Sequence, residues 1–193
     1  GTQFALYLLF NIPKRRAEIM RRKDREMDPV FALEVIDKAA YWVVSIITDK
    51  ILPYGVPLSI ARKGNNLYFH SAPQGEKVMH LAQNPYVCVT FVGEARVPDD
   101  FSPEEMRKIA AGEAGANHVL NNIFTTEYES AIVKGQVVPV EDEKEKIDAL
   151  RIICEKYTPA YMDYFAMAVK ASLKKTHVYK IEIAEITGKR KRV

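Results

Sequence analysis

Cysteine is scarce in this sequence, and no pattern suited to holding a metal is present. Cys88 and Cys154 are the 2 cysteines among 193 residues; each lies in an apolar stretch, and neither belongs to a CxxC or Cys/His ligand spacing. A structural zinc site and a secreted disulfide scaffold are therefore not expected. GxGxxG and GxxxxGKS runs are also absent, which argues against Rossmann and P-loop nucleotide binding.

Long hydrophobic runs and an excess of one charge sign are missing too. The apolar run at residues 4–10 is far short of the roughly 20 residues that span a bilayer. Basic residues at 14–16 follow this run, whereas a signal peptide places its charge first. With 28 basic against 25 acidic residues, the net charge of +3 is too small to indicate a nucleic-acid surface. We therefore expect a cytoplasmic protein with no membrane and no nucleic-acid partner.

The length and composition are those of one folded unit. A chain of 193 residues with 48% hydrophobic and 27% charged residues has enough apolar side chains for a core of its own. We expect an N-terminal arm over residues 1–27 and one domain over residues 28–193. The domain should contain an insertion at about residues 95–124, which includes a stretch rich in Gly, Ala and Asn.

Short β-branched and alternating segments dominate the pattern of the domain. They predict about six strands, at residues 41–48, 54–62, 67–71, 86–93, 128–140 and 177–186. The first reads as a strand that is buried on both faces. Pro57 removes a backbone donor from the second, which should therefore lie at an edge or contain a bulge. Gly135 predicts a bulge in the fifth.

Helices are expected around these strands. Helix starts are indicated at residues 28, 102 and 142, where an N-capping side chain precedes Pro or Glu at helical spacing. Further helices are predicted at residues 74–84 and 159–173. The expected fold is mainly β with peripheral helices, and the similar spacing of the strands favours a small antiparallel barrel over a doubly wound sheet.

The segment YFHSAPQGEKV at residues 68–78 is the most informative part of the chain. A strand ends at His70 and Ser71, and Gly75 and Lys77 stand at the start of a helix. The free amides and the positive dipole end of a helix suit a phosphate, to which the Ser71 hydroxyl and the Lys77 ammonium could also bind. The alternative is an ordinary capped helix with a solvated lysine.

The chain resembles a known family in three segments: PYGVPLSIARKGNNLYFHSAPQGEKVMHLAQNPYVCVTFVG at residues 53–93, TTEYESAIVKGQ at 125–136 and EITGKRKR at 185–192. They are similar to the pyridoxamine 5′-phosphate oxidase-like flavin-binding split barrels, and among these to the Nim-type 5-nitroimidazole resistance flavoproteins. The resemblance implies a six-stranded antiparallel Greek-key split β-barrel that forms a homodimer. It also implies one flavin, FMN or alternatively FAD, at each of two sites between the subunits.

The resemblance assigns cofactor-binding residues by their position. Those placed next to the isoalloxazine ring are Val56, Pro57, Leu58 and Ser59, and those placed around the phosphate and ribityl chain are His70, Ser71 and Lys77. Those expected to reach the flavin from other strands are Tyr128, Ser130, Lys189 and Arg190, the first two from the partner subunit. His70 is also a candidate catalytic acid, because the pKa of histidine lies near neutrality; the alternative is a histidine that only binds phosphate or backbone.

The function implied is that of a flavin-dependent oxidoreductase. It would pass electrons from NAD(P)H through the flavin to a small acceptor such as a nitroaromatic compound. The arginine-rich signature with which pyridoxamine phosphate oxidase binds its substrate phosphate is missing near the C-terminus, so vitamin B6 synthesis is not expected. Two alternatives stay open: a non-catalytic flavin- or haem-binding sensor, and a nucleic-acid binder that uses the basic residues at 189–192.

Overall fold

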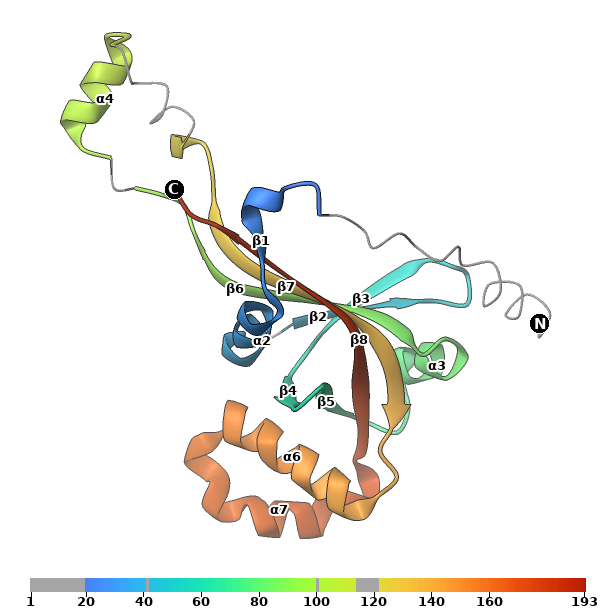
Figure 1. The fold of residues 1–193 in the computed structure, drawn as a ribbon. Coiled ribbons are helices and arrows are strands. Elements are labelled where there is room, and N and C mark those ends of the chain that lie inside the picture. Colours follow the sequence, from blue (N-terminus) through green and yellow to red (C-terminus); the bar gives the residue numbers. More distant parts are fainter. Residues whose placement is uncertain (1–19, 41, 100, 114–121) are drawn as a thin grey trace.

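The computed structural model describes residues 20–40, 42–99, 101–113 and 122–193. Within these residues the chain forms one antiparallel sheet of eight strands with five α-helices around it (Figure 1). The expectation of a mainly β fold with peripheral helices is confirmed. No helix in the described part of the chain is long and apolar enough to cross a membrane.

The strands are β1 (Glu26–Met27), β2 (Trp42–Ile47), β3 (Pro53–Leu58), β4 (Ile60–Lys63), β5 (Asn66–Ser71), β6 (Tyr86–Arg96), β7 (Glu127–Pro139) and β8 (His177–Lys191). Their order in the sheet is β3-β2-β6-β7-β8-β5-β4, and β1 pairs with the outer part of β8. β6, β7 and β8 are the long strands, and Figure 1 shows them running through the whole molecule.

The helices are α2 (Pro29–Lys38), α3 (Glu76–Gln83), α4 (Pro103–Ala110), α6 (Glu143–Tyr157) and α7 (Phe165–Ser172). α6 and α7 lie side by side at one end of the sheet, and α4 stands off from the body beyond the far end of β6 (Figure 1). The helix predicted at residues 159–173 is instead a 3-10 turn at Pro159–Tyr164 followed by α7. Residues 114–121 of the predicted insertion and residues 1–19 of the predicted arm lie outside the described residues.

The two end strands of the sheet, β3 and β4, follow one another in the chain, so the sheet must curl to bring its ends together. β3 and β4 are separated by Ser59 alone, yet they stand at opposite ends of the strand order. The segment predicted as one strand at residues 54–62 is therefore two, and β1 adds another, which accounts for eight strands where about six were expected. The predicted edge position of the strand that contains Pro57 is confirmed, since β3 pairs with β2 only.

The inner face of the curled sheet encloses the core. Side chains of α2 and of six strands form one buried cluster, in which the Trp42 and Phe91 rings lie 4.5 Å apart. A second cluster packs α6 and α7 against β4 and β5. Burial of each large apolar side chain contributes about 1.5–3 kcal/mol relative to its exposed state, so these two clusters hold the helices on the sheet.

The outer face of the sheet is uncovered over β2. Val44 and Ile46 are buried on the inner side, whereas Val43 and Ile47 are each 40% exposed on the outer side. The prediction that this strand is buried on both faces is wrong for the described chain, because no second layer covers these two side chains within the described residues.

The helix starts predicted from N-capping side chains at residues 102 and 142 are confirmed. Ser102 and Glu105 form the expected capping box at the start of α4, and the Asp142 carboxylate accepts a hydrogen bond from the Glu145 amide at the start of α6. A bulge lies beside Gly135, but its extra residue is Ala184 of β8, so the prediction of a bulge in the strand that contains Gly135 is right in position and wrong in strand. A Cβ at Gly135 would stand 2.2 Å from the carbonyl oxygen of Glu182, so the close approach of β7 and β8 requires glycine.

Candidate functional site

A groove of about 420 Å³ lies where β5 ends and α3 begins, and we call it the α3 groove. It is lined by Tyr54, Val56, His70, Ser71, Ala72, Gln74, Gly75, Glu76, Lys77 and Val78. Four residues predicted to bind the cofactor therefore come together here, namely Val56, His70, Ser71 and Lys77. Sequence reasoning missed Tyr54 and Gln74; Tyr54 lies on the same side of β3 as Val56, which is the one signal that could have found it.

Lys77 is the free positive charge of the α3 groove. Its side chain is half-buried, and the ammonium nitrogen lies 5.8 Å from the centre of the Phe69 ring. Burial lowers the pKa of Lys77, because a cation loses hydration there. No carboxylate of the described residues forms an ion pair with it; the adjacent Glu76 instead contacts the buried His80 ring at 3.5 Å. An anion that entered the groove would supply the missing partner.

The start of α3 is shaped to accept an anion at the same place. Gly75 is the N-cap, with φ of 133° and ψ of 164°, a conformation that is almost confined to glycine. No side chain of the described residues caps this helix start, so the first amides of α3 can donate to a ligand. Ser71, which is largely buried, adds a hydroxyl to the groove wall.

His70 stands at the rim of the α3 groove, one residue before Ser71. Its side chain is exposed, and partial desolvation by the groove walls lowers its pKa below the usual 6.5, with a further lowering by the charge of Lys77. The ring is therefore mostly neutral at pH 7 while the groove holds no anion. A bound anion beside Lys77 would raise the pKa of His70 again.

Four of the remaining predicted residues, Pro57, Tyr128, Ser130 and Lys189, share the outer face of the sheet. In the register, Pro57 pairs with Val43, Val43 with Thr90 and Thr90 with Ile132, and directly opposed residues project from the same side. One step along, Val92 pairs with Ser130, and Ser130 pairs with Lys189. The apolar members of this surface are Pro57, Val43, Val92 and Ile132, of which Val92 is 55% exposed.

Tyr128 lies at the far end of this outer face. Burial raises the pKa of its phenol, but hydrogen bonds with Arg25 and Lys189 lower it more, so the net pKa is below 10. The Lys189 ammonium lies 5.9 Å from the centre of the Tyr128 ring. Arg25 was not predicted, and no motif marks it, because it comes from the segment before β1 and meets Tyr128 only through the sheet.

The α3 groove and the Tyr128 end do not meet within one chain. Ser71 pairs with His177 at the start of β8, whereas Lys189 lies twelve residues further along the same strand, about 40 Å of extended chain. Leu58 packs against the core and Ser59 is an exposed link between β3 and β4, so these two flank the groove without lining it. Arg190 pairs with Glu129 in the register and faces the opposite side from Lys189.

A larger groove, of about 700 Å³, lies at the C-terminal end of α2. Its walls include Ala39, Trp42 and Val92, and its polar rim is made of Lys38, Glu94 and Glu129. None of the predicted site residues lines it. Its two carboxylates would repel an anion, and the neighbouring Arg192 guanidinium is already paired with both of them, at 2.8 and 2.7 Å. We therefore regard the α3 groove as the stronger anion site.

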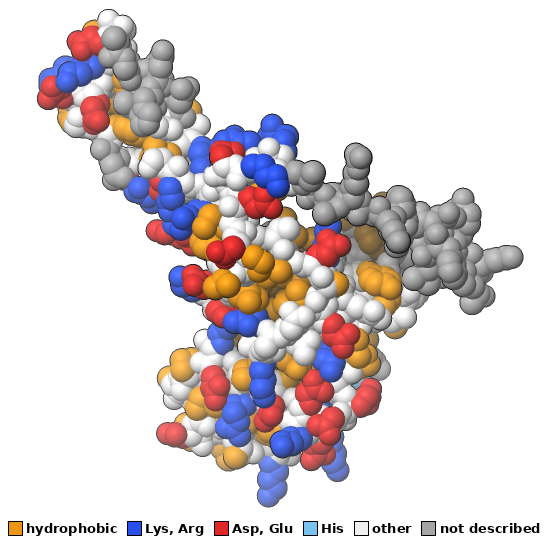
Figure 2. All heavy atoms as spheres, in the orientation of Figure 1, with side chains coloured by type: hydrophobic (Ala, Val, Ile, Leu, Met, Phe, Trp, Pro, Cys, Tyr) orange, Lys and Arg blue, Asp and Glu red, His pale blue; other side chains and the backbone are white. Residues whose placement is uncertain are grey.

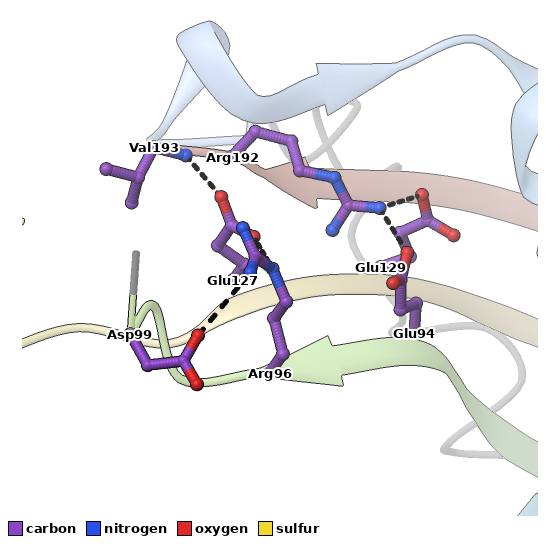
Figure 3. Close-up of polar contacts among 7 residues, drawn as sticks. All are labelled: Glu94, Arg96, Asp99, Glu127, Glu129, Arg192 and Val193. Atoms are coloured by element: carbon purple, nitrogen blue, oxygen red, sulfur yellow. Dashed lines mark hydrogen bonds and ion pairs between the residues drawn. The ribbon is translucent and has the colours of Figure 1, made fainter. Parts of the chain in front are cut away.

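Arg192 belongs to a charge network that ties the end of the chain to β6 and β7 (Figure 3). Glu127 is buried, and its carboxylate accepts hydrogen bonds from Arg96 at 2.6 Å and from the Val193 amide at 2.7 Å. These bonds lower the pKa of Glu127. The network fixes the outer parts of β6, β7 and β8, on which Tyr128, Ser130 and Lys189 are carried.

No group of three or more His, Cys, Asp or Glu side chains that could hold a metal ion occurs among the described residues. On the face drawn in Figure 2, apolar side chains gather over the middle of the molecule near α2, and Lys and Arg alternate with Asp and Glu around α6 and α7. The charges on this face therefore do not form a continuous basic surface.

Solved structures with the same fold include flavin-binding and haem-binding proteins. A proposed 5-nitroimidazole antibiotic resistance protein from Bacteroides thetaiotaomicron VPI-5482 is 26% identical, with a TM-score of 0.62 over 86% of each chain. The flavocytochrome Anf3 from Azotobacter vinelandii is 17% identical, with a TM-score of 0.68 over 94% of this chain and 76% of the other. An FAD and haem binding protein from Mycobacterium smegmatis is 15% identical, with a TM-score of 0.67 over 88% and 74%.

No curated protein matches the sequence. The family model described as pyridoxamine 5′-phosphate oxidase does match, over residues 31–105 and 105–190, and so covers most of the chain. This confirms the resemblance seen in the sequence. The chain belongs to the pyridoxamine 5′-phosphate oxidase family.

Proposed function

We propose that the protein is a flavin-dependent oxidoreductase whose α3 groove binds the phosphate of FMN. The observation that carries the proposal is Lys77, a half-buried cation without an acidic partner among the described residues, beside an uncapped helix start. Backbone amides at a helix start and a lysine ammonium are among the groups that bind phosphate in proteins. Ser71 and His70 complete the polar wall, and FAD is the alternative if the cofactor extends beyond the groove.

The flavin ring would then lie along β3, toward Pro57, Leu58 and Ser59. β3 is an edge strand of the described sheet, so its backbone groups on the outer side pair with no described strand and can bond to the ring. The location of Val56 in the α3 groove and of Pro57 on the outer face supports this position.

A second copy of the chain would complete the site by covering the outer face. Apolar side chains that are 40–55% exposed, such as Val43, Val92 and Ile132, support an interface there. A two-fold related copy can bring its own Tyr128, Ser130 and Lys189 to a groove that they do not reach within one chain. We therefore propose a homodimer with two flavin sites. In each subunit, β3 and β4 would count as one bent strand, which with β2, β5, β6, β7 and β8 makes a six-stranded Greek-key split barrel.

The bound flavin would supply the redox chemistry, taking two electrons from NAD(P)H and passing them to a small acceptor. The chain's own part is to hold the phosphate at Lys77, to orient the ring along β3 and to offer His70 as a proton donor. The Bacteroides protein, which is 26% identical, is described as a proposed 5-nitroimidazole antibiotic resistance protein. We therefore propose a nitroaromatic compound as the acceptor. A cytoplasmic location, where reduced nicotinamide is available, suits this reaction.

The test is the visible spectrum of the purified protein, with mass analysis of the released cofactor to separate FMN from FAD. We expect flavin absorbance that bleaches with NADH or NADPH and recovers with a nitroaromatic acceptor. A colourless protein that binds neither added FMN nor added FAD would overturn the proposal.

A non-catalytic flavin or haem carrier is the second candidate, because the Mycobacterium smegmatis protein of the same fold is described as binding both FAD and haem. A carrier would bind its cofactor but show no useful rate of bleaching with NAD(P)H. A haem held between His70 and His177 is disfavoured by the register, in which Ser71 and not His70 stands opposite His177, so the two rings project from opposite faces.

The dimer has its own test in solution. Val43→Glu places a charge on the outer face and should convert a dimer into a monomer in analytical ultracentrifugation. Val97→Glu is the matched control, because Val97 is 64% exposed beyond the end of β6. A wild-type protein that sediments as a monomer would contradict the proposed interface and would mean that the α3 groove is formed by one chain alone.

A further inference from the structure

The last two residues of α6 support the junction of β3 and β4 from behind. The Tyr157 hydroxyl donates to the Ile60 carbonyl oxygen at 2.9 Å and accepts from the Ile60 amide at 3.1 Å. β4 ends the strand order, so one of its edges has no strand neighbour in the part of the chain that the structure describes. The Tyr157 hydroxyl therefore takes the place that a neighbouring strand would hold, and it satisfies both backbone groups of the residue that follows Ser59.

Lys156, the preceding residue, holds the other side of the same junction. Its ammonium nitrogen lies 4.2 Å from the centre of the Trp42 ring and donates to the Ile36 carbonyl oxygen at 3.2 Å. Trp42 stands directly opposite Leu58 in the pairing of β2 and β3. Leu58, Ser59 and Ile60 are thus held between Trp42 on one side and Tyr157 on the other.

Leu58 and Ile60 pack in the core, and among the described residues Tyr157 is the side chain that hydrogen-bonds to the backbone of this turn. Ser59 is exposed and lies between two strands that the sheet sends to opposite ends. Arg62 ties the far part of β4 to Asp37 of α2, two residues beyond Ile60. The direction in which Leu58 and Ser59 leave β3 is therefore set where Tyr157 meets Ile60.

We propose that Tyr157 and Lys156 are positioning residues for the flavin, and that they fix the Leu58–Ser59–Ile60 turn against which its ring is held. The inference rests on the proposed function, because it places the ring along β3. Neither side chain lines the α3 groove, so they act through the turn and not by contact with the cofactor.

The test is Tyr157→Phe, which removes the hydroxyl and keeps the ring. Tyr68→Phe is the matched control, because the Tyr68 hydroxyl also links the sheet to α6, by donating to Glu145 at 2.9 Å. Both variants lose a hydroxyl bonded to the same packed layer. Only Tyr157→Phe frees the backbone of Ile60.

We expect Tyr157→Phe to weaken FMN binding about tenfold and to shift the absorption maximum of the flavin that remains bound. Tyr68→Phe should leave both unchanged at a comparable loss of thermal stability. If Tyr157→Phe does not fold, Lys156→Met is the second variant. We expect it to weaken FMN binding and shift the flavin spectrum in the same way, because it removes the ammonium that lies over Trp42.

Equal losses of FMN affinity in Tyr157→Phe and Tyr68→Phe, or an unchanged spectrum and affinity in Tyr157→Phe, overturn this inference alone. A wild-type chain that binds no flavin overturns the proposed function and this inference with it. The two failures are therefore told apart by the wild-type titration.

Discussion

The Lys77 ammonium lies over the face of Phe69, 5.8 Å from the ring centre, and faces the α3 groove without a carboxylate partner among the described residues. A ring face attracts a cation only weakly at a partly exposed site. The arrangement therefore holds the charge in place without neutralising it, as a phosphate-binding lysine requires. Burial accounts for the lowered pKa of Lys77.

Lys77→Ala should weaken FMN affinity by about 1–3 kcal/mol, the value of a charge-assisted hydrogen bond. Only the charged form attracts phosphate, and the pKa of Lys77 is below its usual 10.5. FMN affinity of the wild type should therefore fall as the pH rises through that lowered pKa. Titration of the apoprotein with FMN at a series of pH values measures both effects.

Lys77→Arg is the control for charge, because arginine stays protonated over this range. Its FMN affinity should not fall with rising pH. Parallel slopes in the wild type and Lys77→Arg would show that another group is responsible for the pH dependence.

Substitution of His70 distinguishes a role in proton donation from a role in flavin binding. Its pKa lies below 6.5 before an anion binds and rises when a phosphate binds beside Lys77, so a role as proton donor predicts faster turnover as the pH falls through the pKa of His70 in the flavin-loaded protein. His70→Gln should retain flavin, lower turnover by about 100-fold and lose this pH dependence. Loss of flavin instead, seen in the visible spectrum at unchanged thermal stability, would make His70 a binding residue only.

Part of the site could be predicted because it is local in the chain. His70, Ser71 and Lys77 lie within eight consecutive positions, and a strand end followed by a helix start brings them to one groove. The edge position of β3 was also predictable, because Pro57 lacks the amide that an inner strand needs.

The outer face and the break at Ser59 could not be predicted, because they depend on strand pairings and contacts between residues far apart in the sequence. The outer face joins Pro57, Ser130 and Lys189 through the register of five strands. The break at Ser59 accompanies a contact with Tyr157, which is 97 positions from Ile60. A pattern of alternating residues gives the face on which each side chain lies, but not which strand stands beside it.

Gly75 is required by its backbone conformation and not by lack of space. Its φ of 133° is unfavourable for any residue with a Cβ, although no atom lies within 4 Å of the position that a Cβ would take. Gly75→Ala should therefore cost about 1–3 kcal/mol of stability and turn the first amides of α3 away from the groove. Chemical denaturation and FMN titration of the same samples give the two values.

Gly64→Ala is the matched control for Gly75→Ala. Gly64 also has a positive φ, of 60°, and open space around it, but it lies in the turn between β4 and β5 and away from the groove. We expect it to lower stability by about 1 kcal/mol and to leave FMN affinity unchanged. Equal loss of affinity in the two variants would mean that the helix start does not bind the phosphate.

Lys156 makes the stability of the fold depend on pH in a direction opposite to that of an ordinary lysine ion pair. Burial lowers its pKa from 10.5 to about 8, and the nearby Asp37 only partly offsets this. Between these two values the unfolded chain binds a proton at Lys156 that the folded chain does not, so this residue contributes increasing stability as the pH rises from about 8 to 10.5.

Lys156→Arg stays charged in both states and lacks this contribution. The difference in melting temperature, wild type minus Lys156→Arg, should therefore grow between pH 7.5 and pH 10, as measured by calorimetry at about five pH values with other titrating groups common to both chains. A difference that is flat or that shrinks over this range would show that the Trp42 ring and the Ile36 carbonyl stabilise the ammonium enough to cancel the cost of its burial.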